Sequence, residues 1–121
     1  MNDARQRAGR VGEDAAVEAL RTRGYRILER NVRLRHGELD VVAEEAGELV
    51  FVEVKARRSG THGTPAEAVG ARKQRALARL ALGYLVRRRL GERACRFDVV
   101  EVWLPPAGPP RVEILRDAFR P

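Results

Sequence analysis

The sequence lacks the features that mark several specialised classes of protein. It contains a single cysteine, Cys95, so no internal disulfide can form and a reducing compartment is expected. No apolar run approaches the ~20 residues that a transmembrane helix needs, and the first residues do not resemble a signal peptide. A chain of 121 residues is expected to form one domain with its own core. Together these features predict a cytoplasmic, globular, single-domain protein (residues 1–121) without a membrane partner.

Some residue types that often carry chemistry or base stacking are also scarce. Aromatic residues make up 5% of the chain, too few to indicate a platform for single-stranded bases. His36 and His62 each lie in an expected turn or loop without a partner at ligand spacing, which favours an exposed structural role over metal binding. No glycine-rich phosphate loop is present, so ATP dependence is not expected.

Positive charge is what the chain has in excess. The 24 basic and 17 acidic residues give a formal net charge of +7. Such a charge favours polyanions, because each neutralised phosphate releases condensed counterions. However, 22 of the 24 basic residues are arginine, a bias that genome composition can also produce. Charge therefore favours a nucleic-acid partner without deciding the matter.

Hydrophobic periodicity predicts two helices and five strands in the order αβββαββ. The first helix is expected over residues 4–23. The second is expected from Pro65, where Thr64 and Glu67 have the spacing of a capping box, to about Leu90, with Gly70 as a weak point. Its buried stripe is expected to contain Leu77, Leu80, Ala81, Tyr84 and Leu85. The strands are expected at residues 25–33, 38–43, 48–55, 97–104 and, as a short edge strand, 112–115. Short turns between the first three strands imply an antiparallel meander, and the whole order predicts an α/β fold with a mixed sheet flanked by helices.

The candidate chemistry lies on the second and third predicted strands. Alternation along a strand places Glu53 and Lys55 on one face. A surface ion pair would explain these two residues by themselves. Asp40 favours a different interpretation, because the hairpin between the two strands can bring its carboxylate beside that of Glu53. Two such carboxylates repel each other unless a cation lies between them.

A pair of carboxylates at this position predicts a site for Mg²⁺ or Mn²⁺, since these hard cations prefer oxygen ligands. The main-chain carbonyl of Val54 is a candidate for a further ligand. Lys55 is one of only two lysines, with Lys73, in a chain whose other basic residues are all arginine. A compact ammonium can hold an attacking water or the charge that grows on a scissile phosphate.

These residues lie within motifs that resemble a known family. The segment 37–43 followed by 52–57 is similar to the D…ExK motif of the restriction-endonuclease-like superfamily. More closely, the whole chain resembles the bacterial YraN family, which is assigned to that fold. The resemblance extends over Gly9–Glu13, Gly24, Tyr25, Asn31, both motif strands, Lys73 and Phe97–Val100. The superfamily also includes archaeal Holliday-junction resolvases, which have a similar order of elements. Many of its members have proline before the first aspartate, where this chain has Leu39.

The resemblance implies a restriction-endonuclease-like core and Mg²⁺-dependent hydrolysis of phosphodiester bonds in DNA, including branched or junction DNA. Asp40 and Glu53 would hold the metal, and Lys55 would position or activate water. Glu13 would match an acidic residue that many relatives supply from the first helix, although an ordinary exposed helix residue explains it equally well. Glu38 is expected on the strand face opposite Asp40, outside the main set. Analogy with junction resolvases implies a homodimer.

Basic residues near the motif are candidates for binding phosphates. Arg57 and Arg58 follow the motif strand, and Arg72 and Lys73 lie in the second helix. A solvated helix face explains the helical pair equally well, although the resemblance covers Lys73. Two rivals to the nuclease stay open. One is a non-catalytic nucleic-acid-binding module that retains the fold, and the other is a subunit that docks a protein near Trp103 or through the arginine-rich helix.

Overall fold

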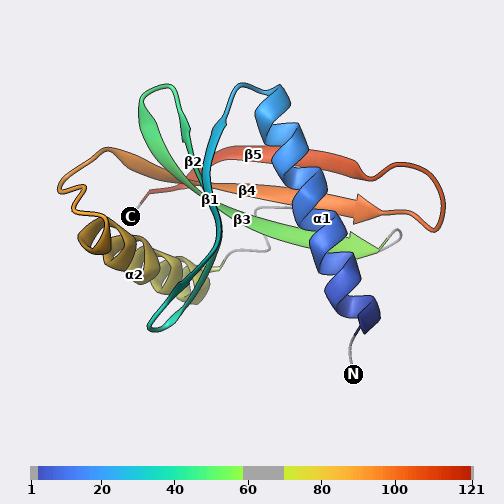
Figure 1. Ribbon diagram of the computed structural model, residues 1–121, viewed down its shortest axis with the longest axis horizontal. Coiled ribbons are helices and arrows are strands. Elements are labelled where there is room, and N and C mark those ends of the chain that lie inside the picture. Colours follow the sequence, from blue (N-terminus) through green and yellow to red (C-terminus); the bar gives the residue numbers. More distant parts are fainter. Residues whose placement is uncertain (1–2, 59–69, 121) are drawn as a thin grey trace.

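A five-stranded mixed β-sheet forms the centre of the computed structural model, which describes residues 3–58 and 70–120, with side chains from residue 9 onward (Figure 1). The strands stand side by side in chain order. The first three form an antiparallel meander, the third and fourth are parallel, and the fifth returns antiparallel. The elements are α1 (Asp3–Thr22), β1 (Arg26–Leu34), β2 (Gly37–Glu45), β3 (Glu48–Arg58), α2 (Ala71–Arg87), β4 (Cys95–Leu104) and β5 (Arg111–Phe119).

This order, αβββαββ, confirms the predicted α/β class and the restriction-endonuclease-like arrangement. Parallel strands need a long crossover connection, and α2 lies in the connection between β3 and β4. Neither helix of the described part of the chain is long and apolar enough to cross a membrane.

The largest differences from the predicted boundaries are at the start of α2 and in the length of β5. Helix α2 begins at Ala71, because Gly70 before it has extended backbone (φ −78°, ψ 176°), whereas the expected start at residues 64–69 lies outside the described residues. Strand β5 has nine residues instead of the short segment 112–115. It is longer because it pairs with β4 from Trp103 down to Phe97, across one irregularity in register.

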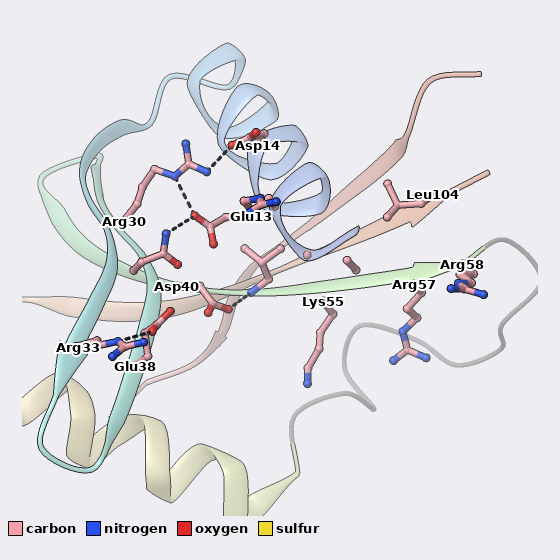
Figure 2. A pocket seen from close by; sticks show the side chains of 15 residues that line it. Glu13, Asp14, Arg30, Arg33, Glu38, Asp40, Lys55, Arg57, Arg58 and Leu104 are labelled. Atoms are coloured by element: carbon pink, nitrogen blue, oxygen red, sulfur yellow. Dashed lines mark hydrogen bonds and ion pairs between the residues drawn. The ribbon is translucent and has the colours of Figure 1, made fainter. Parts of the chain in front are cut away.

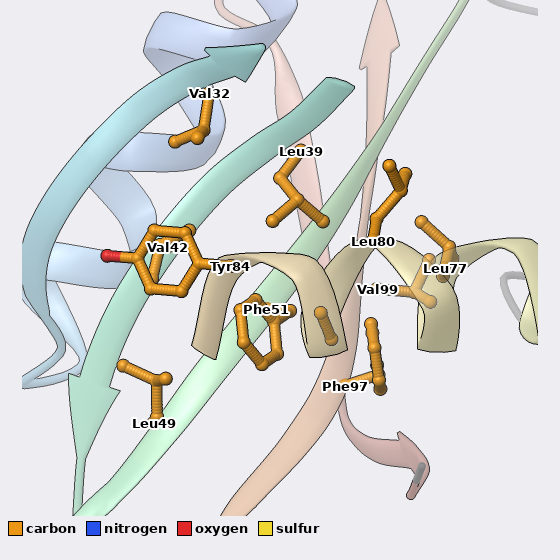
Figure 3. Close-up of a cluster of buried hydrophobic side chains, with 11 residues drawn as sticks. Val32, Leu39, Val42, Leu49, Phe51, Leu77, Leu80, Tyr84, Phe97 and Val99 are labelled. Atoms are coloured by element: carbon orange, nitrogen blue, oxygen red, sulfur yellow. The ribbon is translucent and has the colours of Figure 1, made fainter. Parts of the chain in front are cut away.

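The core on the α2 side of the sheet is built around Phe51 (Figure 3). Its ring packs edge-on against Tyr84 of α2, with centroids 5.7 Å apart, and lies 5.3 Å from the ring of Phe97. The predicted stripe of α2 is confirmed at Leu77, Leu80, Ala81 and Tyr84, which are buried. Leu85 is only partly buried at the margin of this cluster.

Helix α1 covers the opposite face of the sheet. Its buried residues Ala16, Val17 and Leu20 pack against side chains such as Val41 and Val100. The approach is closest at Gly12, where a Cβ atom would lie 2.6 Å from the Cβ of Ala56 in β3. The helix can approach β3 this closely only because glycine has no side chain. This contact brings the next residue, Glu13, close to the carboxyl-terminal half of β3.

Candidate active site

An open groove with a volume of about 1210 Å³ lies between α1, the strands β1 and β2, and the carboxyl-terminal half of β3 (Figure 2). Among the residues predicted to act in catalysis, Glu13, Asp40 and Lys55 line this groove together. Val54, predicted to offer a main-chain ligand, also lines it. Segments far apart in the sequence thus meet at one groove.

Asp40 lies where β2 and β3 separate. The two strands pair from Glu45–Glu48 to Val41–Val52, and no pair beyond Val41 extends the ladder. The main-chain N–H of Val54 instead donates a hydrogen bond to Oδ2 of Asp40 at 2.9 Å. Because a backbone donor that leaves a ladder needs another acceptor, the carboxylate is anchored in the gap between the strands.

The environment of Asp40 disfavours its charged form. Burial, followed by the negative charge of Glu53, raises the pKa of Asp40 to about 6. The hydrogen bond from Val54 opposes this rise, whereas the charges of Glu13 and Glu38 add to it. The charges of three carboxylates therefore act on Asp40 and disfavour its own ionisation.

Glu38 belongs to this acidic group. Glu38 was expected on the opposite strand face and outside the main set, but it lines the same groove and its charge helps to raise the pKa of Asp40. Regular alternation does not hold at this level of β2, because Leu39 and Val41 pack on opposite sides of the sheet. The carboxylate of Glu38 also lies 3.6 Å from the guanidinium of Arg33.

Glu13 is held by two donors from β1. Nε of Arg30 and Nδ2 of Asn31 both donate to Oε1 of Glu13, at 2.9 and 3.0 Å. The side chain of Glu13 is only 14% exposed. The structure therefore places Glu13 in the groove wall, unlike an ordinary solvated helix residue. Neither Arg30 nor Asn31 was expected at the site, since periodicity carries no signal for them.

Glu53 is not one of the residues that line the groove. It is buried, at 9% exposure, and its Oε1 lies 3.5 Å from Nζ of Lys73 on α2. Its charge still reaches Asp40, as the raised pKa of that residue shows. Lys73, predicted to bind phosphate, also neutralises part of the charge of Glu53.

The donor set fits Mg²⁺ or Mn²⁺ in kind. Asp40 and Glu53 are hard oxygen donors whose mutual repulsion a cation would relieve. Within residues 3–58 and 70–120, however, no group of three or more His, Cys, Asp or Glu side chains is placed to hold a metal ion. The carbonyl of Val54 and water would therefore have to complete the coordination.

The other predicted phosphate-binding residues are divided between the groove and the helix. Arg57 and Arg58 line the groove. The guanidinium of Arg57 forms an ion pair with Glu101, a fully buried residue of β4 that went unnoticed in the sequence. A charged residue within an apolar strand was the signal that could have revealed it. Arg72 and Lys73 lie at the start of α2, exposed and outside the groove lining.

Three other residues singled out in the sequence have simpler surroundings. His36 is exposed in the turn between β1 and β2, as expected. His62 lies outside the described residues. Trp103 is half-buried on β4, with the guanidinium of Arg111 from β5 above its ring, 4.4 Å from the centroid.

A second buried polar cluster lies near the start of β4. Asp98, fully buried, accepts hydrogen bonds from Oη of Tyr25 (2.6 Å) and Nε of Arg96 (2.9 Å). The main-chain N–H of Asp117 is a third donor, also at 2.9 Å. Arg96 further contacts Glu45 and Glu48. Each charge in this cluster has an opposite partner, so the arrangement is that of a structural network.

Comparison with known proteins identifies the family to which this fold and groove belong. The pattern of the group described as "Uncharacterised protein family UPF0102" matches residues 12–102. A UPF0102 protein of Symbiobacterium thermophilum is 54% identical over 114 residues, which cover 94% of this chain and 97% of the relative. One from Moorella thermoacetica is 50% identical, over 98% of this chain and 100% of the relative. With matches of this extent, the chain belongs to the UPF0102 family, the YraN family.

Proposed function

We propose that the protein is a Mg²⁺-dependent endonuclease that hydrolyses phosphodiester bonds in DNA, including branched or junction DNA. The observation that carries this proposal is the convergence of the Asp40 and Glu13 carboxylates with Lys55 in one open groove. The raised pKa of Asp40 supports it, because uncompensated carboxylates in a cleft are typical of sites that await a cation or a proton.

Asp40 and Glu53, with the carbonyl of Val54, would hold the metal ion. A bound Mg²⁺ supplies a Lewis acid for the phosphoryl oxygen and lowers the pKa of a coordinated water. The chain's own residues do the remaining work. The ammonium of Lys55, which also lines the groove, would position the attacking water or stabilise charge on the phosphate. The N–H of Val54 keeps the carboxylate of Asp40 between the strands.

The charge of the groove supports a nucleic-acid substrate. Arginines from three elements line it, namely Arg10 of α1, Arg30 and Arg33 of β1, and Arg57 and Arg58 of β3. Arginine binds phosphate oxygens through two parallel hydrogen bonds. Symmetric cleavage of a junction needs two such sites, so we also propose a homodimer as the active form.

Titration calorimetry with Mg²⁺ or Mn²⁺ tests the metal site. We expect saturable binding by the wild type and its loss in Asp40→Asn and Glu53→Gln. Glu18→Gln, which alters an exposed carboxylate on the far part of α1, is the matched control and should bind as the wild type does. Equal binding by all four proteins would exclude a site at Asp40 and Glu53.

Cleavage assays on linear, nicked, flapped and four-way-junction DNA test the enzyme. We expect Mg²⁺-dependent products with at least one substrate, and none with Asp40→Asn or after chelation by EDTA. Products that persist in both conditions would contradict the proposed mechanism.

The second candidate is a non-catalytic nucleic-acid-binding module. It is favoured by the lack of three clustered ligand side chains among the described residues. In that case, DNA binding would survive EDTA and the Asp40→Asn substitution, and no substrate would be cut. Salt-dependent retardation of DNA in gels, measured beside the cleavage assay, separates the two functions.

A further inference from the structure

Asn31 has a strained backbone inside β1, at the level of Asp40 in the neighbouring strand. Its φ is 53°, in the left-handed region that residues other than glycine seldom adopt. The pairs Arg30–Val41 and Val32–Leu39 flank it, which places residue 31 opposite residue 40. Positive φ is ordinary in a turn but unusual in the middle of a strand, where it marks a local constraint.

The strain accompanies a reversal of strand faces. Arg30 bonds to Glu13 on the α1 side of the sheet, whereas Val32 packs in the cluster on the α2 side. In a regular strand, residues two apart would share a face. In β2, Val41 and Leu39 likewise pack on opposite sides. Both strands therefore break their alternation at one level, around Asn31 and Asp40.

The break turns two polar side chains toward the groove. Asn31 and Asp40 both line it. The amide of Asn31 donates to Oε1 of Glu13 at 3.0 Å, and Figure 2 shows Glu13 lying between Arg30 and Asp40. Arg30 bonds the same oxygen but also donates to Asp14 at 2.6 Å. The amide of Asn31, by contrast, makes its described hydrogen bond to Glu13 alone.

Both donors act on Oε1 of Glu13, so within the described part of the chain Oε2 accepts no hydrogen bond. The carboxylate is thus fixed by one oxygen while the other stays available. The groove wall at this point contains Glu13, Asp40 and Val54 together. Because Oε1 is held by both donors, Oε2 is already ordered and can bind a cation or a water beside Asp40.

From this geometry we infer that Asn31 is a positioning residue, held in a left-handed conformation so that its amide orients the Glu13 carboxylate toward Asp40. This inference rests on the proposed metal-dependent function for its consequence, but the contact itself does not need a metal. Arg30 supplies charge to Glu13, and Asn31 fixes its direction. The strain at residue 31 persists because the surrounding strands and helix require that direction.

The test uses substitutions that suit the left-handed backbone. Asn31→Gly removes the amide while keeping the conformation available, so the fold should remain. We expect Mn²⁺ binding, measured by calorimetry, to weaken by about 10–100-fold, as is usual when a residue that orients a ligand is lost. Ala46→Gly is the matched control, because Ala46 has the same φ of 53° in the β2–β3 turn. It should leave Mn²⁺ affinity unchanged.

A double-mutant cycle distinguishes positioning from a general structural effect. In a Glu13→Ala background, Asn31→Gly should cause no further loss of Mn²⁺ affinity, because the residue through which Asn31 acts is already absent. An undiminished loss in that background would overturn the inference, as would unchanged affinity in Asn31→Gly alone.

Carbon-13 relaxation of the Glu13 side chain, measured without metal, keeps the inference testable if the wild type binds no Mn²⁺. We expect a rigid side chain in the wild type and in Ala46→Gly, and a mobile one in Asn31→Gly. Equal rigidity in all three proteins would overturn the role of Asn31. Failure of wild-type Mn²⁺ binding, with mobility increased only in Asn31→Gly, would instead refute the proposed function and leave the positioning contact established.

Discussion

Two polar clusters in the same sheet differ in the groups that surround their central aspartate, Asp98 in one and Asp40 in the other. Near the start of β4, Asp98 accepts hydrogen bonds from Tyr25, Arg96 and a main-chain N–H. Near the end of β3, Asp40 accepts one main-chain hydrogen bond and otherwise faces the carboxylates of Glu13, Glu38 and Glu53.

The difference separates a structural cluster from a functional one. Charges buried with partners stabilise a particular arrangement, and removal of one partner leaves the other uncompensated. Carboxylates buried without such partners lower stability at neutral pH. A protein retains them where a ligand supplies the missing charge. The deficit at Asp40 is therefore a stronger sign of function than the burial of Asp98, although Asp98 is the more deeply buried.

The largest effect is expected from a substitution in the cluster around Asp98, whose charges all have opposite partners. Asp98→Ala removes the fully buried carboxylate that pairs with buried Arg96, so we expect the free energy of unfolding to fall by about 3–5 kcal/mol. Urea denaturation followed by circular dichroism measures this change. Glu18→Gln, on the exposed face of α1, should change stability by less than about 0.5 kcal/mol. If Asp98→Ala lowered the free energy of unfolding by as little as Glu18→Gln does, the cluster around Asp98 would not be structural.

A second substitution should disturb the candidate site and leave the cluster around Asp98 intact. Gly12→Ala places a Cβ against Ala56 and forces α1 away from β3, which we expect to cost about 1–3 kcal/mol of unfolding free energy. It should also weaken Mn²⁺ binding, because Glu13 moves with the helix. Gly9→Ala is the matched control, since its Cβ would meet no atom within 4 Å. Equal effects of the two substitutions would show that the close approach does not constrain α1.

Replacing the Asp40 carboxylate by a neutral amide should stabilise the fold. In the pH range between 3.8, the usual pKa of aspartate, and about 6, folded Asp40 retains a proton that the unfolded chain has lost. The stability contributed by this proton is therefore lost as pH rises through that range. At pH 7, we expect Asp40→Asn to be more stable than the wild type by on the order of 2 kcal/mol, with a smaller difference near pH 4. Thermal or urea unfolding at both pH values checks this. If Asp40→Asn were less stable than the wild type at pH 7, the charge of Asp40 would not be destabilising.

The smallest expected effect is on metal affinity. Because a cation competes with the proton on Asp40, Mn²⁺ binding should weaken about tenfold between pH 7 and pH 5. Calorimetry at the two pH values, in matched buffers, measures the change. Affinity that is independent of pH in this range would place the bound cation away from Asp40.

Much of the fold could be predicted because its signals are local. Period-two and helical patterns identify the order of seven elements and the buried stripe of α2, since each depends on residues a few positions apart. The length of β5 escaped prediction. Its pairing with β4 passes through an irregularity, and Asp117 within it has a positive φ of 53°, so its pattern does not alternate cleanly.

The candidate site was predictable in part for the same reason. Asp40, Val54 and Lys55 belong to adjacent strands joined by a short turn, and their convergence follows from hairpin geometry. The contribution of Asn31 could not be derived in this way, because it depends on a break in alternation that no local pattern encodes. The pairing of Lys73 with Glu53 likewise required the packing of α2 on the sheet.

The sequence by itself determined which elements form, which of their faces are apolar, and which charged groups are available. Only the tertiary structure decided which of those charges are compensated. Tyr25 and Asp98 are 73 positions apart, and Arg96 reaches Glu48 across 48 positions. Compensation depends on distances between atoms of such remote residues, because the interaction energy of two charges varies inversely with their separation. Local pattern therefore supplied the carboxylates, and packing brought three of them close enough to Asp40 to disfavour its charge.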